Sequence, residues 1–169
     1  MAETYKLIQH YELASATPAI TFSNIPQTYT DLLVKYSLRC DTGNVEMYGT
    51  FNGNTSNVYT YKILRTNYAV GVGDDAGTAT TYAKHYINWS STTSNVFGNG
   101  EMYIPNYTNS SNKPYTFDDM TQNNTTDAWM QWHAGLFLST SPITSITFTA
   151  NTGNFVQYSS ASLYGINNA

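Results

Sequence analysis

The sequence predicts an all-β protein, folded as an antiparallel two-sheet sandwich that is jelly-roll-like and has about ten short strands. The composition is the first observation: 15% of the 169 residues are aromatic, 15 of them tyrosines, and only 11% are charged. Tyrosine and threonine favour strands, whereas asparagine, glycine and serine favour tight turns. The second observation is that short segments of alternating apolar and polar residues recur along the chain, separated by turn residues.

The clearest strand lies in residues 30–39. Leu32, Val34, Tyr36 and Leu38 fall on one side of it, which predicts that this side faces the core and the other side faces solvent. The turn-like segments 41–44 and 52–57 then join it to two further strands. In this half of the chain, strands are predicted at 4–13, 19–22, 30–39, 45–51 and 58–64.

The second half contains one predicted loop and one ambiguous segment. Residues 71–77, rich in glycine and aspartate, form the most loop-like stretch of the chain. Residues 126–138 could begin a helix capped by Asp127, but their apolar residues alternate and Gly135 weakens a helix interior. We therefore predict a strand there, with Trp132 on its core side. The strands predicted in this half are 82–89, 96–104, 115–120, 126–138, 143–149 and 155–164.

No convincing long helix is predicted, so parallel α/β architecture, which needs crossover helices, is excluded. The length fits one β-sandwich domain covering residues 1–169. Within it, residues 1–14 form either an edge strand of the sandwich or an N-terminal arm that reaches a neighbouring molecule. In the second case Tyr5, Leu7 and Tyr11 would supply the contacts.

Charge and hydropathy argue against two classes of partner. The net charge is −4, the isoelectric point is about 5.1, and the seven basic residues are scattered, whereas nucleic-acid binding needs clustered basic residues. No apolar run approaches the roughly 20 residues of a membrane span, and the N-terminus lacks a signal pattern. We expect no nucleic-acid or membrane partner. We also expect that the protein is synthesised in a reducing cytoplasm.

The residues give no support to an enzyme. Asp74–Asp75 and Asp118–Asp119 are adjacent pairs, and adjacent strand residues point to opposite faces, so neither pair supplies the facing carboxyls of a glycoside hydrolase. Cys40 is the single cysteine and is expected to be a buried small apolar residue. We predict no catalytic residues and no cofactor.

No metal site is predicted either. His10, His85 and His133 are far apart in sequence and show no local metal-ligand spacing. Segments 41–44 and 71–75 carry oxygen side chains that could bind Ca²⁺, but their spacing matches no EF-hand, and turns of this composition are common without metal.

Aromatic residues are the stronger candidates for a binding role. Trp89, Tyr107 and Trp129 are expected in or beside loops or polar strands. Such rings contact partner proteins or stack on sugars, although they can also fill a sandwich core. For Trp89 and Trp129 the two interpretations carry equal weight, whereas Trp132 is assigned to the core.

Several blocks of the sequence resemble structural proteins of tailed bacteriophages, especially marine and environmental phages. The resemblance begins in residues 21–36, TFSNIPQTYTDLLVKY, where a Phe-x-x-Ile-Pro-x-x-Tyr-x-x-Leu pattern leads into a long alternating strand. It continues in residues 51–57 (FNGNTSN), 103–107 (YIPNY), 143–148 (ITSITF) and 153–166 (GNFVQYSSASLYGI). These blocks span nearly the whole chain.

The resemblance implies a virion structural protein, with no catalytic residues to transfer. The first expectation is a decoration protein on the outside of the phage head, bound to the major capsid protein or other virion proteins, and forming a homotrimer. The alternative is a receptor-binding or carbohydrate-binding domain of a tail fibre. In that case Trp89, Tyr107 and Trp129 would stack on a host glycan.

Overall fold

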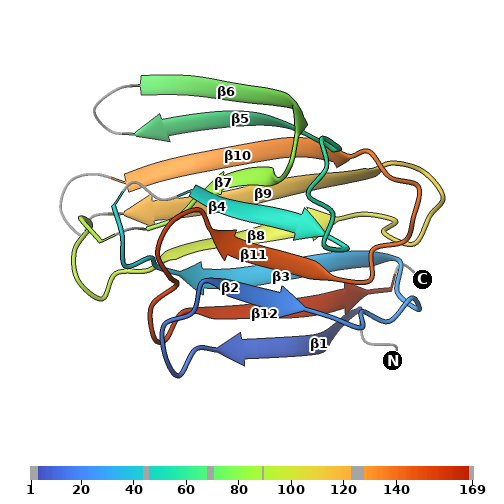
Figure 1. The fold of residues 1–169 in the computed structure, drawn as a ribbon, viewed down its shortest axis with the longest axis horizontal. Coiled ribbons are helices and arrows are strands. Elements are labelled where there is room, and N and C mark those ends of the chain that lie inside the picture. Colours follow the sequence, from blue (N-terminus) through green and yellow to red (C-terminus); the bar gives the residue numbers. More distant parts are fainter. Residues whose placement is uncertain (1–3, 44–45, 68–70, 89, 123–127, 168–169) are drawn as a thin grey trace.

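The structure, a computed structural model, describes residues 4–43, 46–67, 71–88, 90–122 and 128–167. These residues form two antiparallel sheets packed face to face (Figure 1). The strands of the larger sheet are β1 (Tyr5–Glu12), β3 (Asp31–Leu38), β5 (Tyr59–Asn67), β6 (Gly71–Thr80), β8 (Gly98–Ile104), β9 (Lys113–Gln122), β10 (Ala128–Phe137) and β12 (Ser160–Ile166). Those of the smaller sheet are β2 (Ala19–Phe22), β4 (Glu46–Phe51), β7 (Ala83–Tyr86) and β11 (Ile146–Ala150).

The strand order confirms the two-sheet sandwich and shows the jelly-roll pattern. The larger sheet runs β1-β12-β3-β8-β9-β10-β5-β6 and the smaller sheet β2-β11-β4-β7. Antiparallel pairs are nested, β1 with β12, β2 with β11, β3 with β8 and β4 with β7. The chain thus resembles a long hairpin rolled up so that successive strands alternate between the two sheets.

Four strands are additions to this roll and widen only the larger sheet. Strands β5 and β6 are inserted between β4 and β7, whereas β9 and β10 are inserted between β8 and β11. In Figure 1 they lie together at the top of the molecule, with β6 at the edge of the sheet. Strand β7 is an edge strand of the smaller sheet. It contacts β5, the first of the added strands.

The core lies between the sheets and confirms the inward face predicted for β3. Leu32, Val34, Tyr36 and Leu38 are all buried. Cys40 is buried as expected, and burial raises the pKa of its thiol to about 12 with help from the nearby charge of Asp41. None of the described residues belongs to a helix of the length and apolarity that spanning a bilayer requires.

The turn predicted at 52–57 joins β4 to β5 through Asn52 and Gly53. Both have positive φ, 55° and 64°, a backbone conformation that asparagine and glycine adopt most readily. The turn carries the chain from the smaller sheet to the larger one. The Asn52 carboxamide oxygen also accepts a 2.8 Å hydrogen bond from the main chain of Thr144. One asparagine therefore shapes the turn and fixes the segment that precedes β11.

Two sequence predictions in the added strands are wrong. The stretch 71–77, predicted as a loop, belongs to strand β6, which pairs with β5. In β10 the strand is correct but its face is inverted: Trp132 is 45% exposed, whereas Gln131 and His133 are buried.

Residues 5–12 form the edge strand β1 and do not extend from the domain. They pair along their length with β12, with a register shift between Leu7 and Gln9. The rings of Tyr11 and Phe22 lie 5.5 Å apart, which ties β1 to the smaller sheet. Tyr5, Leu7 and Tyr11 nevertheless remain exposed.

Candidate functional site

The outer side of the four added strands carries a patch of exposed apolar side chains, which we call the extension face. Since β10 points His133 toward the main chain of β7, the alternate residues of β10 point away from the smaller sheet. The extension face consists of Leu64, Val72, Met120, Met130, Trp132 and Leu136. All six side chains are exposed.

The strand register makes the extension face continuous. Met130 lies opposite Met120 of β9, and Trp132 lies opposite Leu64 of β5. Directly opposed residues have Cβ atoms roughly 4.5–5.5 Å apart, so these side chains form neighbouring pairs across the sheet. Contiguous exposed apolar surface on a soluble domain marks a binding site or an aggregation hazard.

A shallow depression lies beside Trp132 on the same side of the sheet. Its lining adds polar side chains to Met120, Met130 and Trp132, namely Lys35, Asn99, Glu101 and Asp118. Lys35 Nζ and a Glu101 carboxylate oxygen form an exposed ion pair at 3.1 Å. Charged side chains and the amide of Asn99 therefore border the extension face on the side toward β3 and β8.

The aromatic residues singled out from the sequence occupy different environments. Tyr107 is fully buried and donates a hydrogen bond from its hydroxyl to the main-chain oxygen of Pro26, so it offers no surface contact. Trp129 is half-buried on the inward side of β10, with the Arg65 guanidinium 6.0 Å from its ring centroid. Trp89 lies outside the described residues. Trp132, assigned to the core, is the tryptophan of the extension face.

A second site lies in the core, where the added strands meet β7. His85 of β7, Asp119 of β9 and His133 of β10 are buried together, and we call them the core polar cluster. Asp119 Oδ2 lies 3.3 Å from His85 Nδ1 and 3.7 Å from His133 Nε2. Imidazole and carboxylate are common ligands of divalent metals.

Neighbouring groups orient all three members of the core polar cluster. The Tyr36 hydroxyl is 2.7 Å from His85 Nε2, and His133 Nδ1 is 3.1 Å from the main-chain oxygen of Lys84. Gln131 Nε2 donates to Asp119 Oδ1 at 3.0 Å. These contacts leave one nitrogen of each imidazole and one carboxylate oxygen directed at one another.

Burial disfavours the charged forms within the core polar cluster. Desolvation raises the pKa of Asp119 well above its ordinary value, with the charge of Asp118 acting in the same direction. Desolvation lowers the pKa of His85, and it lowers that of His133 to about 4. Both imidazoles are therefore neutral near pH 7, which is the form that coordinates metals.

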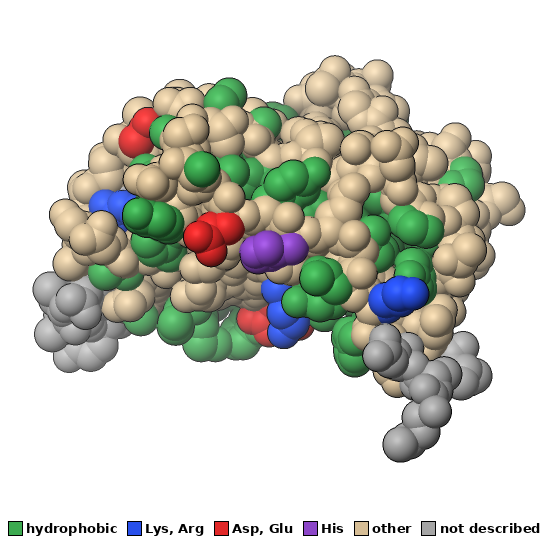
Figure 2. Space-filling view, turned by 90° about the horizontal axis from the view of Figure 1, so that it is seen from below, with side chains coloured by type: hydrophobic (Ala, Val, Ile, Leu, Met, Phe, Trp, Pro, Cys, Tyr) green, Lys and Arg blue, Asp and Glu red, His purple; other side chains and the backbone are tan. Residues whose placement is uncertain are grey.

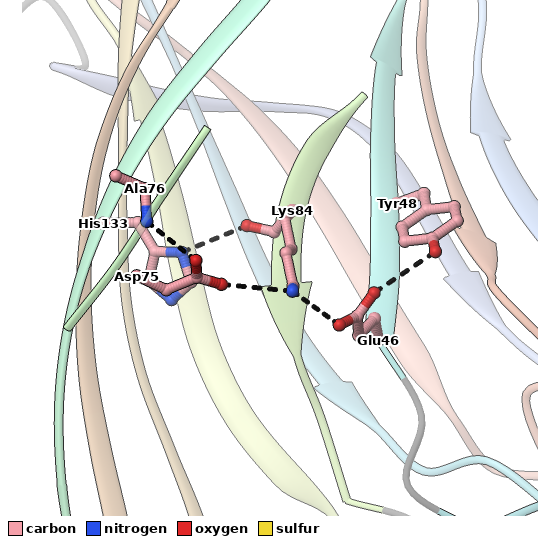
Figure 3. Close-up of polar contacts among 6 residues, drawn as sticks. All are labelled: Glu46, Tyr48, Asp75, Ala76, Lys84 and His133. Atoms are coloured by element: carbon pink, nitrogen blue, oxygen red, sulfur yellow. Dashed lines mark hydrogen bonds and ion pairs between the residues drawn. The ribbon is translucent and has the colours of Figure 1, made fainter. Parts of the chain in front are cut away.

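Lys84 fastens the two sheets beside His133 (Figure 3). Its ammonium lies 2.7 Å from Glu46 of β4 and 3.1 Å from Asp75 of β6, with all three side chains mostly buried. Desolvation opposes the charge of Lys84, but hydrogen bonds with Glu46, Tyr86 and Asp75 outweigh it and raise the pKa. Asp75 is thus part of an ion-pair bridge between the sheets and not a solvated loop residue.

Sequence reasoning missed the core polar cluster because its members are separated along the chain. His85 and His133 come from different sheets, and only the fold brings them together. One signal was present: Gln131 and His133 alternate with apolar residues on β10, where a solvent-facing polar side was the simpler interpretation.

No family model matches the chain, and no curated protein matches it significantly. Function is therefore inferred from the sequence blocks and from the two sites.

Proposed function

We propose that the protein is a structural component of a tailed-phage virion and that it decorates the outside of the head by binding major capsid protein through the extension face. The observation that carries this proposal is the exposed apolar face of the added strands. Trp132, Met120 and Met130 of this face are of residue types that are enriched at protein interfaces. The resemblance of the sequence blocks to phage structural proteins supports a virion protein as the partner.

The low charge of the chain, 11% of its residues, is compatible with many copies packed side by side. Figure 2 shows a face on which few charged side chains are separated by hydrophobic and uncharged polar ones. Low charge limits repulsion between neighbouring copies on a particle. Binding to assembled shell subunits would stabilise the shell by mass action, because the decoration protein binds only the assembled state.

Binding to undecorated particles tests the proposal. Purified protein is mixed with particles of the parent phage that lack it, and the bound fraction is measured by co-sedimentation over a range of concentrations. Trp132→Ser is expected to weaken binding by about 30-fold or more, the loss typical of a central interface tryptophan. Tyr158→Ser is the matched control, since Tyr158 is an exposed aromatic residue outside the extension face.

The proposal is contradicted if wild-type protein does not sediment with the particles, or if Trp132→Ser and Tyr158→Ser behave alike. We further propose that the protein forms a homotrimer around a local symmetry axis. A monomeric mass by light scattering at micromolar concentration would contradict the trimer. It would not bear on the proposal that the extension face binds capsid protein.

The depression beside Trp132 favours a second candidate, a glycan-binding domain of a tail fibre. Sugar sites combine an aromatic surface with carboxylate and amide groups that hydrogen-bond hydroxyls, and Trp132, Asp118 and Asn99 provide this combination. Quenching of tryptophan fluorescence by host polysaccharide, lost in Trp132→Ser, would support this function. Head decoration predicts no quenching.

A further inference from the structure

Among the described residues, the core polar cluster and the adjoining Gln131 hold four buried side-chain atoms that make no hydrogen bond. These atoms are His85 Nδ1, His133 Nε2, Asp119 Oδ2 and Gln131 Oε1. Buried polar atoms are nearly always hydrogen-bonded, and each one left without a partner costs about 1–3 kcal/mol. Three of them, the two imidazole nitrogens and Asp119 Oδ2, meet between the two sheets and call for a group that satisfies them together.

The tautomer of His133 shows what kind of group is needed. Its Nδ1 contacts a main-chain oxygen, which can only accept, so Nδ1 carries the proton. In the neutral ring Nε2 then presents a lone pair toward Asp119 Oδ2, 3.7 Å away. Two acceptors that face each other in a low-dielectric core repel, unless a proton or a cation lies between them.

The spacing favours a cation over a shared proton. A hydrogen bond between these atoms would bring them to roughly 2.7–3.2 Å, and the observed separations from Asp119 Oδ2 are 3.3 and 3.7 Å. In a tetrahedral zinc site with bonds of about 2.0–2.1 Å, neighbouring ligand atoms are roughly 3.3 Å apart. The nitrogens of both imidazoles and a carboxylate oxygen all lie within 4.8 Å of one another. Side-chain movements of about 1 Å would bring the widest pair to the tetrahedral spacing.

We propose that His85, Asp119 and His133 bind a structural zinc ion in the core. The Gln131 side chain, held beside Asp119 by a 3.0 Å hydrogen bond, would supply the fourth ligand through its amide oxygen. Two imidazole nitrogens with carboxylate and amide oxygens suit zinc better than the all-oxygen cations Ca²⁺ and Mg²⁺. The outer contacts of a zinc site are also present, since each imidazole uses its other nitrogen for a hydrogen bond to Tyr36 or Lys84.

The ion would link the two sheets where the added strands begin. His85 belongs to the smaller sheet, whereas Asp119 and His133 belong to the larger one. All three side chains are buried, as in closed structural sites. Because the ligands come together only when the sheets pack, the ion would enter during folding and stabilise the folded state.

Refolding with and without zinc tests this proposal. The full-length protein is unfolded in guanidinium with a chelator, freed of both, and refolded with equimolar Zn²⁺, with Mg²⁺ or with no metal. After gel filtration, mass spectrometry of the metal is expected to find about one zinc per chain and no retained magnesium. The zinc-refolded protein should melt about 5–10 °C higher than the metal-free protein, the shift given by a ligand at a hundred times its Kd.

Three variants separate this site from zinc bound elsewhere. His133→Gln and Asp119→Asn should lose the zinc and the zinc-dependent rise in melting temperature, whereas His10→Gln, which changes a histidine of β1, should keep both. Refolding wild-type protein with Co²⁺ gives a readout independent of the variants' folding, because tetrahedral coordination produces intense visible absorption. Wild-type protein that retains no metal and melts at the same temperature with or without zinc would overturn the proposal, as would zinc retention by His133→Gln.

Discussion

Arg39 holds the segment that follows β7 against the end of β3. The alternation of segment 30–39 puts Arg39 on the side opposite Leu38, yet it is buried. Its guanidinium donates hydrogen bonds to one side chain and several main-chain oxygens. The acceptors lie in residues Ser90, Thr92, Thr93 and Val96. Guanidinium suits this task because its donors lie in a fixed plane and reach several acceptors at once.

Arg39→Lys is expected to lower the free energy of unfolding by about 2–4 kcal/mol. A lysine cannot reach all of these acceptors, so buried main-chain oxygens would lose their partners. Urea unfolding followed by tryptophan fluorescence measures the change. Arg65→Lys is the matched control, since Arg65 lies over the rings of Tyr86 and Trp129 and should cost under about 1 kcal/mol. Equal effects of the two substitutions would contradict this role for Arg39.

Strands β6 and β10 are the elements for which the sequence pattern predicts the structure wrongly. In β6, glycine, aspartate and alanine are poor strand formers, and the strand exists because its backbone pairs with β5 at the edge of the larger sheet. In β10, the apolar alternation correctly predicts a strand. The same alternation assigns the wrong face, because the inward positions hold Gln131 and His133 and the outward positions hold the extension face.

The failures coincide with the proposed sites, and the reason is physical. Alternation predicts the buried face only when burial of apolar side chains decides the orientation, as it does for β3. In a strand such as β10, polar side chains face an internal cluster and apolar side chains face outward. The alternation then assigns the buried side wrongly. The jelly-roll core was therefore predictable from the sequence, whereas both candidate sites needed the pairing of distant strands.

Strand β1 supplies a prediction at the scale of an element. Removing residues 1–14 is expected to lower the free energy of unfolding by about 2 kcal/mol or more, because β12 loses its partner strand and the half-buried Ile8 leaves the core. Thermal or urea unfolding measures the loss. A free arm would instead leave the melting temperature nearly unchanged. Leu7→Ser is the control, since Leu7 is exposed and its replacement should change stability little.

The tyrosine content of the whole molecule predicts loss of stability in alkali. Burial raises the pKa of Tyr59 to about 12, and burial with the nearby Asp31 carboxylate raises that of Tyr103 to about 12. In the unfolded chain both ionise near their ordinary value of about 10. Stabilisation is therefore complete below about pH 10 and is lost as pH rises toward 12, because only the unfolded state releases these protons freely.

Urea midpoints measured from about pH 8 to about pH 11.5 test this dependence, with tyrosinate absorbance recorded in parallel. Stability that stays constant up to the highest pH would show that the buried hydroxyls titrate as freely in the folded protein as in the unfolded chain.

The most direct test of the proposed function is cryo-electron microscopy of the purified parent particle, with an antibody against this chain as a label. We predict label over the whole head, and density that accepts this sandwich at repeated positions with the extension face toward the shell. Label confined to the tail would contradict decoration and support the glycan-binding alternative. Absence of the protein from the particle would contradict the virion proposal itself.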